Sequence, residues 1–183
     1  MDAKLIRELF DYDKDHGRLI WKARKPDSFA ASSEAERKRI CAIWNAKFSG
    51  KFAMSETNGN GYLRGSIFNK KVYLHRCVWA WHHGAWPVNV IDHVNGNRSD
   101  NRIENLRDVS RSQNCHNKPT PANNKSGFKG VSWDNGRKKW LAQIRVEGKN
   151  KTLGHYDNKE DARDAYVKAS KRFVWGGENV HIY

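Results

Sequence analysis

Asp92 and His93 are adjacent residues that carry a carboxylate and an imidazole, and they lie in a stretch, 89–118, that is rich in short polar side chains. This stretch contains seven asparagines and two histidines but no apolar run long enough to build a core. Two explanations are open. Either the segment is a solvated loop of turn-forming residues, or carboxylate, imidazole and amide groups converge there on an ion.

The pattern around this pair predicts a strand, a loop, a second strand and a helix. Two apolar residues precede Asp92 and an Asn-Gly pair follows His93, so both are expected at the end of a strand beside a tight turn. The segment ENLRDVS supplies the second strand, with Asn105 at its start. The segment SRSQ has the spacing of a capping box and begins a helix that carries Asn114 in its first turns. This order of elements can bring Asp92, His93 and Asn114 together.

The residue types indicate a particular chemistry. An aspartate carboxylate and an asparagine amide are hard oxygen donors, a set that suits Mg²⁺ or Mn²⁺ better than zinc. A histidine beside them that is not a ligand can remove a proton from an attacking water molecule. A divalent cation and a base together hydrolyse phosphodiesters, because the cation withdraws charge from the phosphoryl oxygens while the imidazole generates the nucleophile.

The spacing D-H-x-x-G-x-x-x-x-N-R-x-x-N-L, followed by S-x-x-x-N at a helix start, resembles the HNH nuclease family over about 75–118. The resemblance is to the homing-type branch, common among phage and intron-encoded endonucleases, that has D-H-N-N in place of H-N-H. It implies a ββα-metal unit in which Asp92 and Asn114 are metal ligands and His93 is the general base. Asn105 would tie the two strands together and orient the loop that bears His93.

Three further residues are candidates in the same region. His75 and Arg76 match the HR pair that precedes the core in this branch, where each has either a site role or a packing or phosphate-contacting role. His116 competes with Asn114 for the third motif position. The paired cysteines that hold a structural zinc in other HNH branches are missing, so the resemblance implies no zinc.

The net charge of +14, from 34 Lys and Arg against 20 Asp and Glu, predicts a polyanionic partner, and nucleic acid is the leading one. A membrane surface would also suit a basic protein, but the sequence has no basic amphipathic helix with a wide apolar face and no apolar stretch of ~20 residues. Three widely separated cysteines favour a reducing compartment. We expect a cytoplasmic protein, in a bacterial host cell if phage-encoded, without membrane association, as a monomer or weak dimer.

Residues 1–60 carry the least functional information: they can shield the active site, touch DNA or only complete the core. A short helix that includes Leu9 and Phe10 is expected first, followed by a turn and the strand RLIWK. The composition of 25–51 favours a helix. Alternation over 57–76 predicts antiparallel strands, and a further helix is expected to end at Gly84.

The segment PTPANNKSG contains two of the four prolines and is typical of a linker. Beyond it, FKGVSW, KWLAQIRVEG and KNKTLGHY are three strand-like runs, and a helix follows that Asn158 can cap. On the motifs K-G-V, K-W, A-Q-I-R, L-G-H-Y and E-D-A, this part resembles the AP2 DNA-binding domain over about 126–180. The resemblance implies that the three-stranded sheet enters the major groove and the helix packs behind it.

A sheet face with alternate basic and aromatic residues can contact phosphates, sugars and base edges. The DNA-binding candidates are Lys129, Trp133, Arg137, Lys139, Arg145, Lys149 and Lys151. Lys129 replaces the arginine usual in the plant-type pattern, so the base specificity of that pattern is not inherited. Trp140, Leu153 and Tyr156 are expected in the core.

We therefore expect an α+β protein with an HNH domain at 1–118, whose ββα-metal core spans about 88–118, a linker at 119–125 and an AP2-like domain at 126–183. The expected function is metal-dependent hydrolysis of double-stranded DNA by a homing-type or mobile-element endonuclease. One such centre cuts one strand, so a monomer would nick. The alternative is a sequence-specific DNA-binding regulator with an inactive HNH unit.

Overall fold

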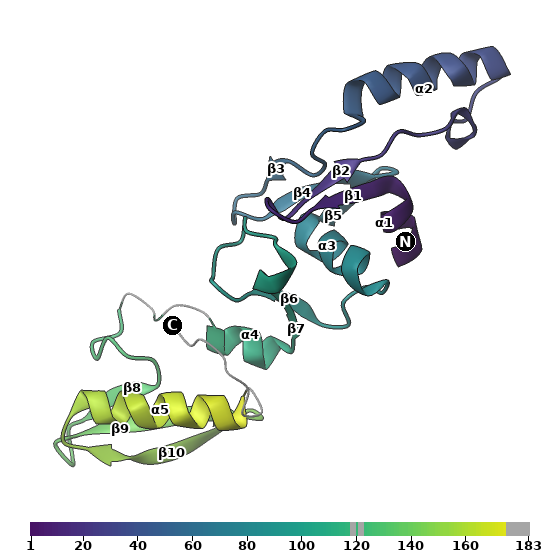
Figure 1. Ribbon diagram of the computed structural model, residues 1–183. Helices are drawn as coiled ribbons and strands as arrows, with labels where there is room; N and C mark the ends of the chain where they lie inside the picture. Colours follow the sequence, from purple (N-terminus) through teal and green to yellow (C-terminus); the bar gives the residue numbers. More distant parts are fainter. Residues whose placement is uncertain (118–119, 121–122, 175–183) are drawn as a thin grey trace. The chain divides into compact units, whose positions relative to one another are not determined.

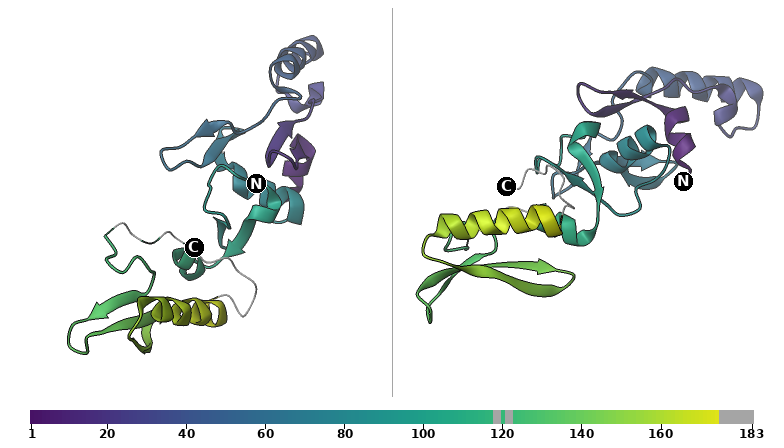
Figure 2. Two further views of the ribbon diagram at one scale, coloured as in Figure 1. Left: turned by 60° about the vertical axis from the view of Figure 1, so that its left-hand side comes forward. Right: turned by 60° about the horizontal axis from the view of Figure 1, so that its bottom comes forward.

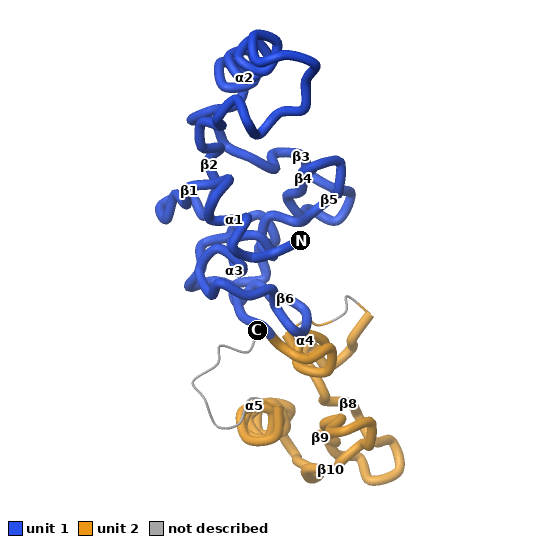
Figure 3. The backbone as a smooth tube through the Cα atoms, turned by 90° about the vertical axis from the view of Figure 1, so that its right-hand side faces the viewer, with its two compact units in different colours: residues 1–108 blue, residues 109–183 orange. Residues whose placement is uncertain are grey.

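The computed structural model describes residues 1–117, 120 and 123–174. The chain forms two compact units, 1–108 and 109–183 (Figures 1 and 3). Helices and small antiparallel sheets occur in both units, so the predicted α+β class is confirmed. Residues 119, 121 and 122 of the predicted linker, and 175–183 of the predicted C-terminal domain, lie outside the described residues.

The first unit begins with helix α1 (Ala3–Leu9) and a hairpin of two strands, β1 (Phe10–Asp13) and β2 (Arg18–Trp21). The prediction that the helix includes Phe10 is wrong. The backbone becomes extended at Phe10, which pairs with Trp21, and the Phe10 side chain is fully buried in the core. Four residues are too few for an apolar pattern to separate the end of a helix from a strand.

The predicted helix over 25–51 is shorter than that segment. Helix α2 (Glu34–Phe48) starts after a serine that caps its first turn, and η1 (Pro26–Ser28) is a separate 3-10 turn. Trp44 of α2 meets Trp21 of β2 edge to face, with ring centroids 5.3 Å apart. Aromatic contact therefore attaches α2 to the N-terminal hairpin.

The strands predicted over 57–76 are present as a three-stranded antiparallel sheet. Its members are β3 (Glu56–Thr57), β4 (Leu63–Ile67) and β5 (Lys70–Tyr73). Helix α3 (Leu74–His83) follows at once and ends, as predicted, at Gly84, whose φ of 67° suits glycine. The buried side chains of α3 form the centre of the core of this unit with residues of α1 and the first hairpin.

The strand–loop–strand–helix order predicted around Asp92 is confirmed. Strands β6 (Val90–His93) and β7 (Leu106–Val109) pair, and η2 (Ile103–Asn105) precedes β7. Helix α4 (Arg111–Asn117) comes next and belongs to the second unit. Its capping box forms: Ser110 N donates to Gln113 Oε1 at 2.9 Å, and Gln113 N donates to Ser110 Oγ at 3.2 Å.

The second unit also contains a three-stranded antiparallel sheet and a long helix. The strands are β8 (Val131–Asp134), β9 (Lys139–Val146) and β10 (Lys149–Tyr156), in the order β10-β9-β8. Helix α5 (Lys159–Phe173) lies across one face of this sheet (Figures 1 and 2). Asn158 occupies the cap position, but its side chain makes no capping bond to the backbone, so the cap prediction holds for position only.

The core of this unit lies between α5 and the sheet. Ala142 and Ile144 of β9 are buried against Ala162 and Tyr166 of α5. Trp140, Leu153 and Tyr156 pack on the same core, as predicted. Among the helices in the described part of the chain, none is long and apolar enough to cross a membrane.

Candidate active site and nucleic-acid interface

The 95–105 loop between β6 and β7 is held by side-chain hydrogen bonds to its own backbone. Asn95 Oδ1 accepts from the Asn97 N–H at 2.9 Å, and Asn97 Oδ1 accepts from the Ser99 N–H at 3.1 Å. Arg102 donates to both oxygens of Asp100, at 2.9 and 2.7 Å, and these bonds help to lower the pKa of the Asp100 carboxyl to about 2. The loop is therefore a defined structure.

His93 ends β6 and is only 3% exposed. Its Nε2 lies 3.2 Å from Oδ1 of Asn101, a residue with no exposed surface. Burial lowers the pKa of the His93 imidazole, an effect that exceeds the opposite effect of the hydrogen bond with Asn101. The ring is neutral near pH 7 as a result, which is the form that can accept a proton.

Asp92 is also buried, and Arg107 of β7 holds one of its two carboxylate oxygens. Arg107 Nε donates to Oδ2 at 2.9 Å, and Nη2 lies 2.8 Å from the same oxygen. The hydrogen bonds that the described residues give this carboxylate are on Oδ2, which leaves Oδ1 for a further ligand. Asp92 thus offers one oriented oxygen.

Asn105 joins the two ends of the loop. Its Oδ1 accepts from Asn95 N at 2.9 Å and its Nδ2 donates to the Asp100 carbonyl oxygen at 2.8 Å. Its own carbonyl oxygen accepts from Val94 N at 2.9 Å, directly after His93. Three hydrogen bonds from one buried residue therefore fix how the chain leaves β6 and enters β7.

His75 and Arg76 are neighbours on α3 with different surroundings. The His75 ring meets the His93 ring edge to face at 5.4 Å and stacks on Tyr73 at 5.4 Å. Burial, with the nearby His93 and Arg76, lowers the pKa of His75 to about 3. The Arg76 guanidinium donates to the carbonyl oxygens of Asn89 and Pro87, at 3.2 and 3.3 Å. Arg76 thus anchors the loop before β6, whereas His75 contacts His93.

Asn114 and His116 lie on α4 in the second unit. Asn114 is half-buried, and its backbone N–H donates to the Ser110 carbonyl oxygen at 3.0 Å. Both ring nitrogens of His116 have partners within this unit: Nδ1 is 3.2 Å from the Tyr166 hydroxyl, and Nε2 is 3.1 Å from the Arg145 carbonyl oxygen. These contacts give His116 a structural role in attaching α4.

Comparison with known proteins agrees with this geometry. Residues 72–116 match the family model described as HNH endonuclease. Protein 3.8 of Escherichia phage T7 is 37% identical to the chain over 110 residues, which are 60% of this chain and 89% of that protein. The chain belongs to the family of T7 protein 3.8 and contains an HNH endonuclease domain. No solved structure gives a significant match.

The HNH domain contains every candidate residue of the β6–β7 region together with Asn114 and His116. It supports a nuclease with DNA as its substrate, and nucleases with this domain generally use a divalent metal ion. Among the described residues there is no cluster of three or more His, Cys, Asp or Glu that could hold a metal ion.

Outside the HNH domain, the predicted DNA-binding residues do not share one face of the β8–β10 sheet. Trp133 pairs with Trp140, Lys151 with Ile144 and Lys149 with Val146, so these three candidates lie on the side of the sheet that α5 covers. Lys139 and Arg145 alternate with the buried residues of β9 and lie on the opposite, open side. The prediction of a single binding face is wrong for this reason.

Most of these candidates have partners inside the second unit. Lys129, which precedes β8, donates to the His116 carbonyl oxygen at 2.7 Å, and burial lowers its pKa. Arg137 pairs with Asp134 at 3.2 Å, and Lys139 pairs with Asp157 at 3.2 Å. Lys151 lies over the Phe173 ring at 4.3 Å. Lys139 remains 44% exposed beside its partner, so it can still reach a phosphate.

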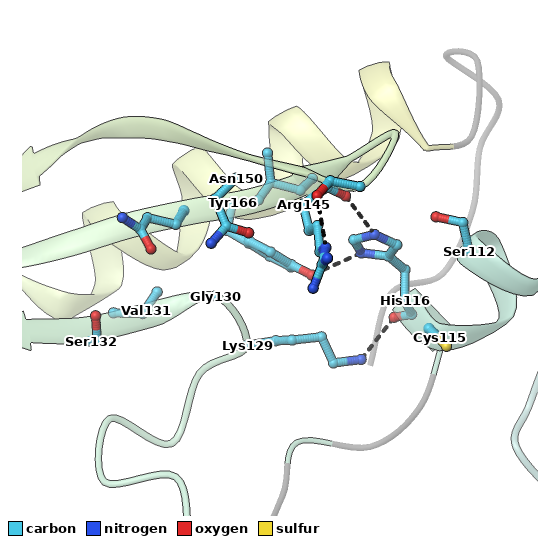
Figure 4. Close-up of a pocket in the computed structure, with 13 residues that line it drawn as sticks. Ser112, Cys115, His116, Lys129, Gly130, Val131, Ser132, Arg145, Asn150 and Tyr166 are labelled. Carbon is cyan, nitrogen blue, oxygen red and sulfur yellow. Dashed lines mark hydrogen bonds between the residues drawn. The ribbon is translucent and has the colours of Figure 1, made fainter.

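A groove of about 900 Å³ lies beside α4 and is lined also by residues of β8, β9 and α5 (Figure 4). Figure 4 shows the His116 ring between the Tyr166 hydroxyl and the Arg145 backbone, with the Lys129 side chain extended toward the His116 carbonyl. Gly130 lines the groove with a φ of 68°, and a Cβ there would lie 2.2 Å from the Tyr166 ring. Glycine is therefore required for α5 to approach β8.

Sequence reasoning missed two groups of residues. Asn101 and Arg107 contact His93 and Asp92. Asn101 is a position of the spacing pattern to which no role was assigned, and Arg107 lies one residue beyond the end of the pattern. On the open face of the sheet, Gln143, Asn150 and Thr152 offer hydrogen-bonding side chains beside Arg145. In β9, the apolar residues Ala142 and Ile144 alternate with the polar residues Gln143 and Arg145. This alternation in the sequence would have predicted that Gln143 and Arg145 lie on the open face.

Proposed function

We propose that this protein is a metal-dependent DNA endonuclease of the homing or mobile-element type, in which Asp92 and Asn114 hold the metal ion and His93 is the general base. The observation that carries the proposal is the buried imidazole of His93, neutral near pH 7, beside a carboxylate with one oxygen left for a ligand, both in an HNH domain.

The residues fit a hard divalent cation. The carboxylate Oδ1 of Asp92 and the amide oxygen of Asn114 are the donors that Mg²⁺ and Mn²⁺ prefer, and so sparse a protein set leaves positions for water and phosphate. When bound, the cation would stabilise charge on the phosphoryl and leaving oxygens. Arg107 holds the other oxygen of Asp92, so it orients this ligand.

The remaining residues prepare the base. His93 accepts a proton from the attacking water, and Asn105 holds the loop that follows it through three hydrogen bonds. His75 packs against the His93 ring. We assign His75 a supporting role, and we place Arg76 and His116 outside the chemistry because their polar groups hold backbone carbonyls or the Tyr166 hydroxyl.

The second unit would hold the duplex through an AP2-like sheet. On its open face, Lys139 and Arg145 can neutralise phosphates, while Gln143 and Asn150 can donate to and accept from base edges. The net charge of +14 supports this role. One base and one metal ion act on one strand, so a monomer nicks the duplex.

Conversion of supercoiled plasmid to open circles tests this function. We expect nicking with Mg²⁺ or Mn²⁺ and none with EDTA. Mapping the ends of nicked genomic fragments would then give the target. Protein that binds DNA but cuts none, across several metals and target sequences, would contradict the proposal and support a DNA-binding regulator.

A further inference from the structure

Asn101 is the most completely buried polar residue beside the proposed base, with 0% of its surface exposed. Its side chain bridges two groups. Oδ1 lies 3.2 Å from Nε2 of His93, and Nδ2 donates to the carbonyl oxygen of Ser99 at 2.9 Å. Nothing in the D-H-N-N motif assigns this asparagine a role.

The bond to Ser99 fixes which way the Asn101 amide faces. A backbone carbonyl oxygen can only accept a hydrogen bond, so the group that faces Ser99 must be the NH₂. The other amide atom, the acceptor Oδ1, therefore faces His93. Since Oδ1 cannot donate, Nε2 of His93 must carry the hydrogen. A neutral imidazole has one N–H, so Nδ1 is the nitrogen with the lone pair.

The backbone at Asn101 is held from outside the loop as well. Gly17, in the β1–β2 turn, lies so close that a Cβ there would be 2.5 Å from the Asn101 carbonyl carbon. The Tyr12 hydroxyl accepts from Ile103 N at 3.0 Å. The N-terminal hairpin thus braces the short segment that presents the Asn101 side chain to His93.

We propose that Asn101 is a positioning residue for the endonuclease reaction: its side-chain oxygen holds His93 in the Nε2–H tautomer and so makes Nδ1 the atom that accepts the proton from water. This inference rests on the proposed function, since it assumes that His93 is the base. With the other tautomer, the lone pair would be on Nε2, which faces Asn101, and the base could not serve a water on the Nδ1 side.

The tautomer can be measured directly in the full-length protein. Long-range ¹H–¹⁵N correlation spectra of the histidine-labelled chain, at about pH 8 and above the ordinary histidine pKa of ~6.5, distinguish Nε2–H from Nδ1–H rings. The signal that is lost in His93→Ala assigns His93. We expect the Nε2–H pattern in the wild type. An Nδ1–H pattern would overturn the inference without any need for a variant.

Two variants at the position separate positioning from packing. Asn101→Leu has a similar volume and no acceptor, so we expect a mixture of His93 tautomers and a fall in the single-turnover nicking rate of roughly ten- to a hundred-fold, the range for loss of an orienting partner. DNA affinity should not change. Asn101→Asp keeps an acceptor for Nε2–H, so it should keep the wild-type tautomer and lose less than about tenfold.

The outcomes separate this inference from the proposed function. Active wild-type protein with the Nδ1–H tautomer, or Asn101→Leu that nicks at the wild-type rate, would overturn the inference and leave the endonuclease standing. Wild-type protein that cuts no DNA would overturn the proposed function and the inference with it. If Asn101→Leu does not fold, Asn101→Asp decides the question. If this variant, which keeps an acceptor for Nε2–H, still loses the Nε2–H tautomer of His93 and the nicking rate, positioning by the Asn101 oxygen is contradicted.

Discussion

At the scale of single residues, four of the seven asparagines in the 89–118 stretch show that its polar side chains have two different uses. Asn95 and Asn97 form turns with their own backbone, as a polar loop predicts. Asn101 and Asn105 are buried and hold His93 and the ends of its loop. Turn chemistry and site chemistry therefore occupy the same segment.

The D-H-N-N positions could be predicted because their spacing is local, whereas the contacts that Asn101 and Arg107 make with them could not. Asp92, His93 and Asn105 are identified by fixed distances along the chain. Asn101 and Arg107 reach the same groups only after the loop closes and β6 pairs with β7, and asparagine and arginine are common in solvated loops. No periodicity distinguishes them from their neighbours.

Asp100 provides a test of the loop by stability. Its pKa of about 2 lies below the ordinary 3.8, so its ionised form stabilises the fold above about pH 4, and this contribution is lost as pH falls toward 2. We expect Asp100→Asn to lower the free energy of unfolding by about 1 kcal/mol near pH 7, since the pair with Arg102 is partly exposed. Urea unfolding across this pH range should show that the wild type and Asp100→Asn no longer differ in free energy of unfolding at the acid end. If the two proteins differed by the same free energy of unfolding at the acid and the neutral end, ionised Asp100 would not be the stabilising group.

At the scale of elements, the N-terminal hairpin has a role that the sequence did not reveal. The sequence leaves three roles open for residues 1–60. In the structure, the β1–β2 turn packs its Gly17 against the backbone at Asn101 and Arg102. Hairpin and loop are separated by about eighty positions along the chain. A contact of that kind depends on how the core assembles, which no local pattern encodes.

Gly17→Ala tests this brace, with Gly50→Ala as its matched control. Both glycines have positive φ, 61° and 74°, but a Cβ at residue 17 would lie 2.3 Å from Arg102 N, whereas nothing lies within 4 Å of one at residue 50. We expect Gly50→Ala to cost about 1 kcal/mol from backbone strain alone. Gly17→Ala should cost more than about 3 kcal/mol and reduce nicking, because the 95–105 loop must shift.

Thermal unfolding and plasmid nicking of the two variants measure these effects. Equal stability and equal activity in Gly17→Ala and Gly50→Ala would show that the hairpin does not support the loop.

The sheet of the second unit shows why its elements could be predicted while its binding face could not. Three strands and a helix were apparent from alternation and turn residues, and they are present. Which side of the sheet each basic residue occupies depends on strand register and on where α5 packs. Trp133, Lys149 and Lys151 therefore lie on the helix side.

At the scale of the whole molecule, the net charge of +14 attracts DNA without selecting one surface of the protein. Binding of the duplex in one orientation therefore requires a particular face of the protein. The open side of the β8–β10 sheet combines Lys139 and Arg145 with uncharged polar residues. The HNH domain supplies the chemistry. We expect the affinity for DNA to come mainly from the second unit and the cutting from the HNH domain.

Charge reversal on the two sides of the sheet tests this division. Lys139→Glu with Arg145→Glu changes the open face, and Lys149→Glu with Lys151→Glu makes the same change in net charge on the helix side. We expect the open-face pair to weaken DNA binding at least tenfold more than the control pair does. The slope of log affinity against log salt concentration should also fall, by about 0.9 for each phosphate that the protein no longer neutralises. Fluorescence anisotropy at several salt concentrations gives both quantities. Equal weakening by the two pairs would indicate only a general effect of charge.

The single-turnover nicking rate of His93→Ala with Mg²⁺ tests whether His93 is the general base. The control is His83→Ala, which changes an exposed histidine on α3. Loss of a general base predicts a fall of about 10²–10⁴-fold for His93→Ala with DNA binding retained, and a wild-type rate for His83→Ala. Nicking by His93→Ala at the wild-type rate would contradict the claim that His93 activates the attacking water.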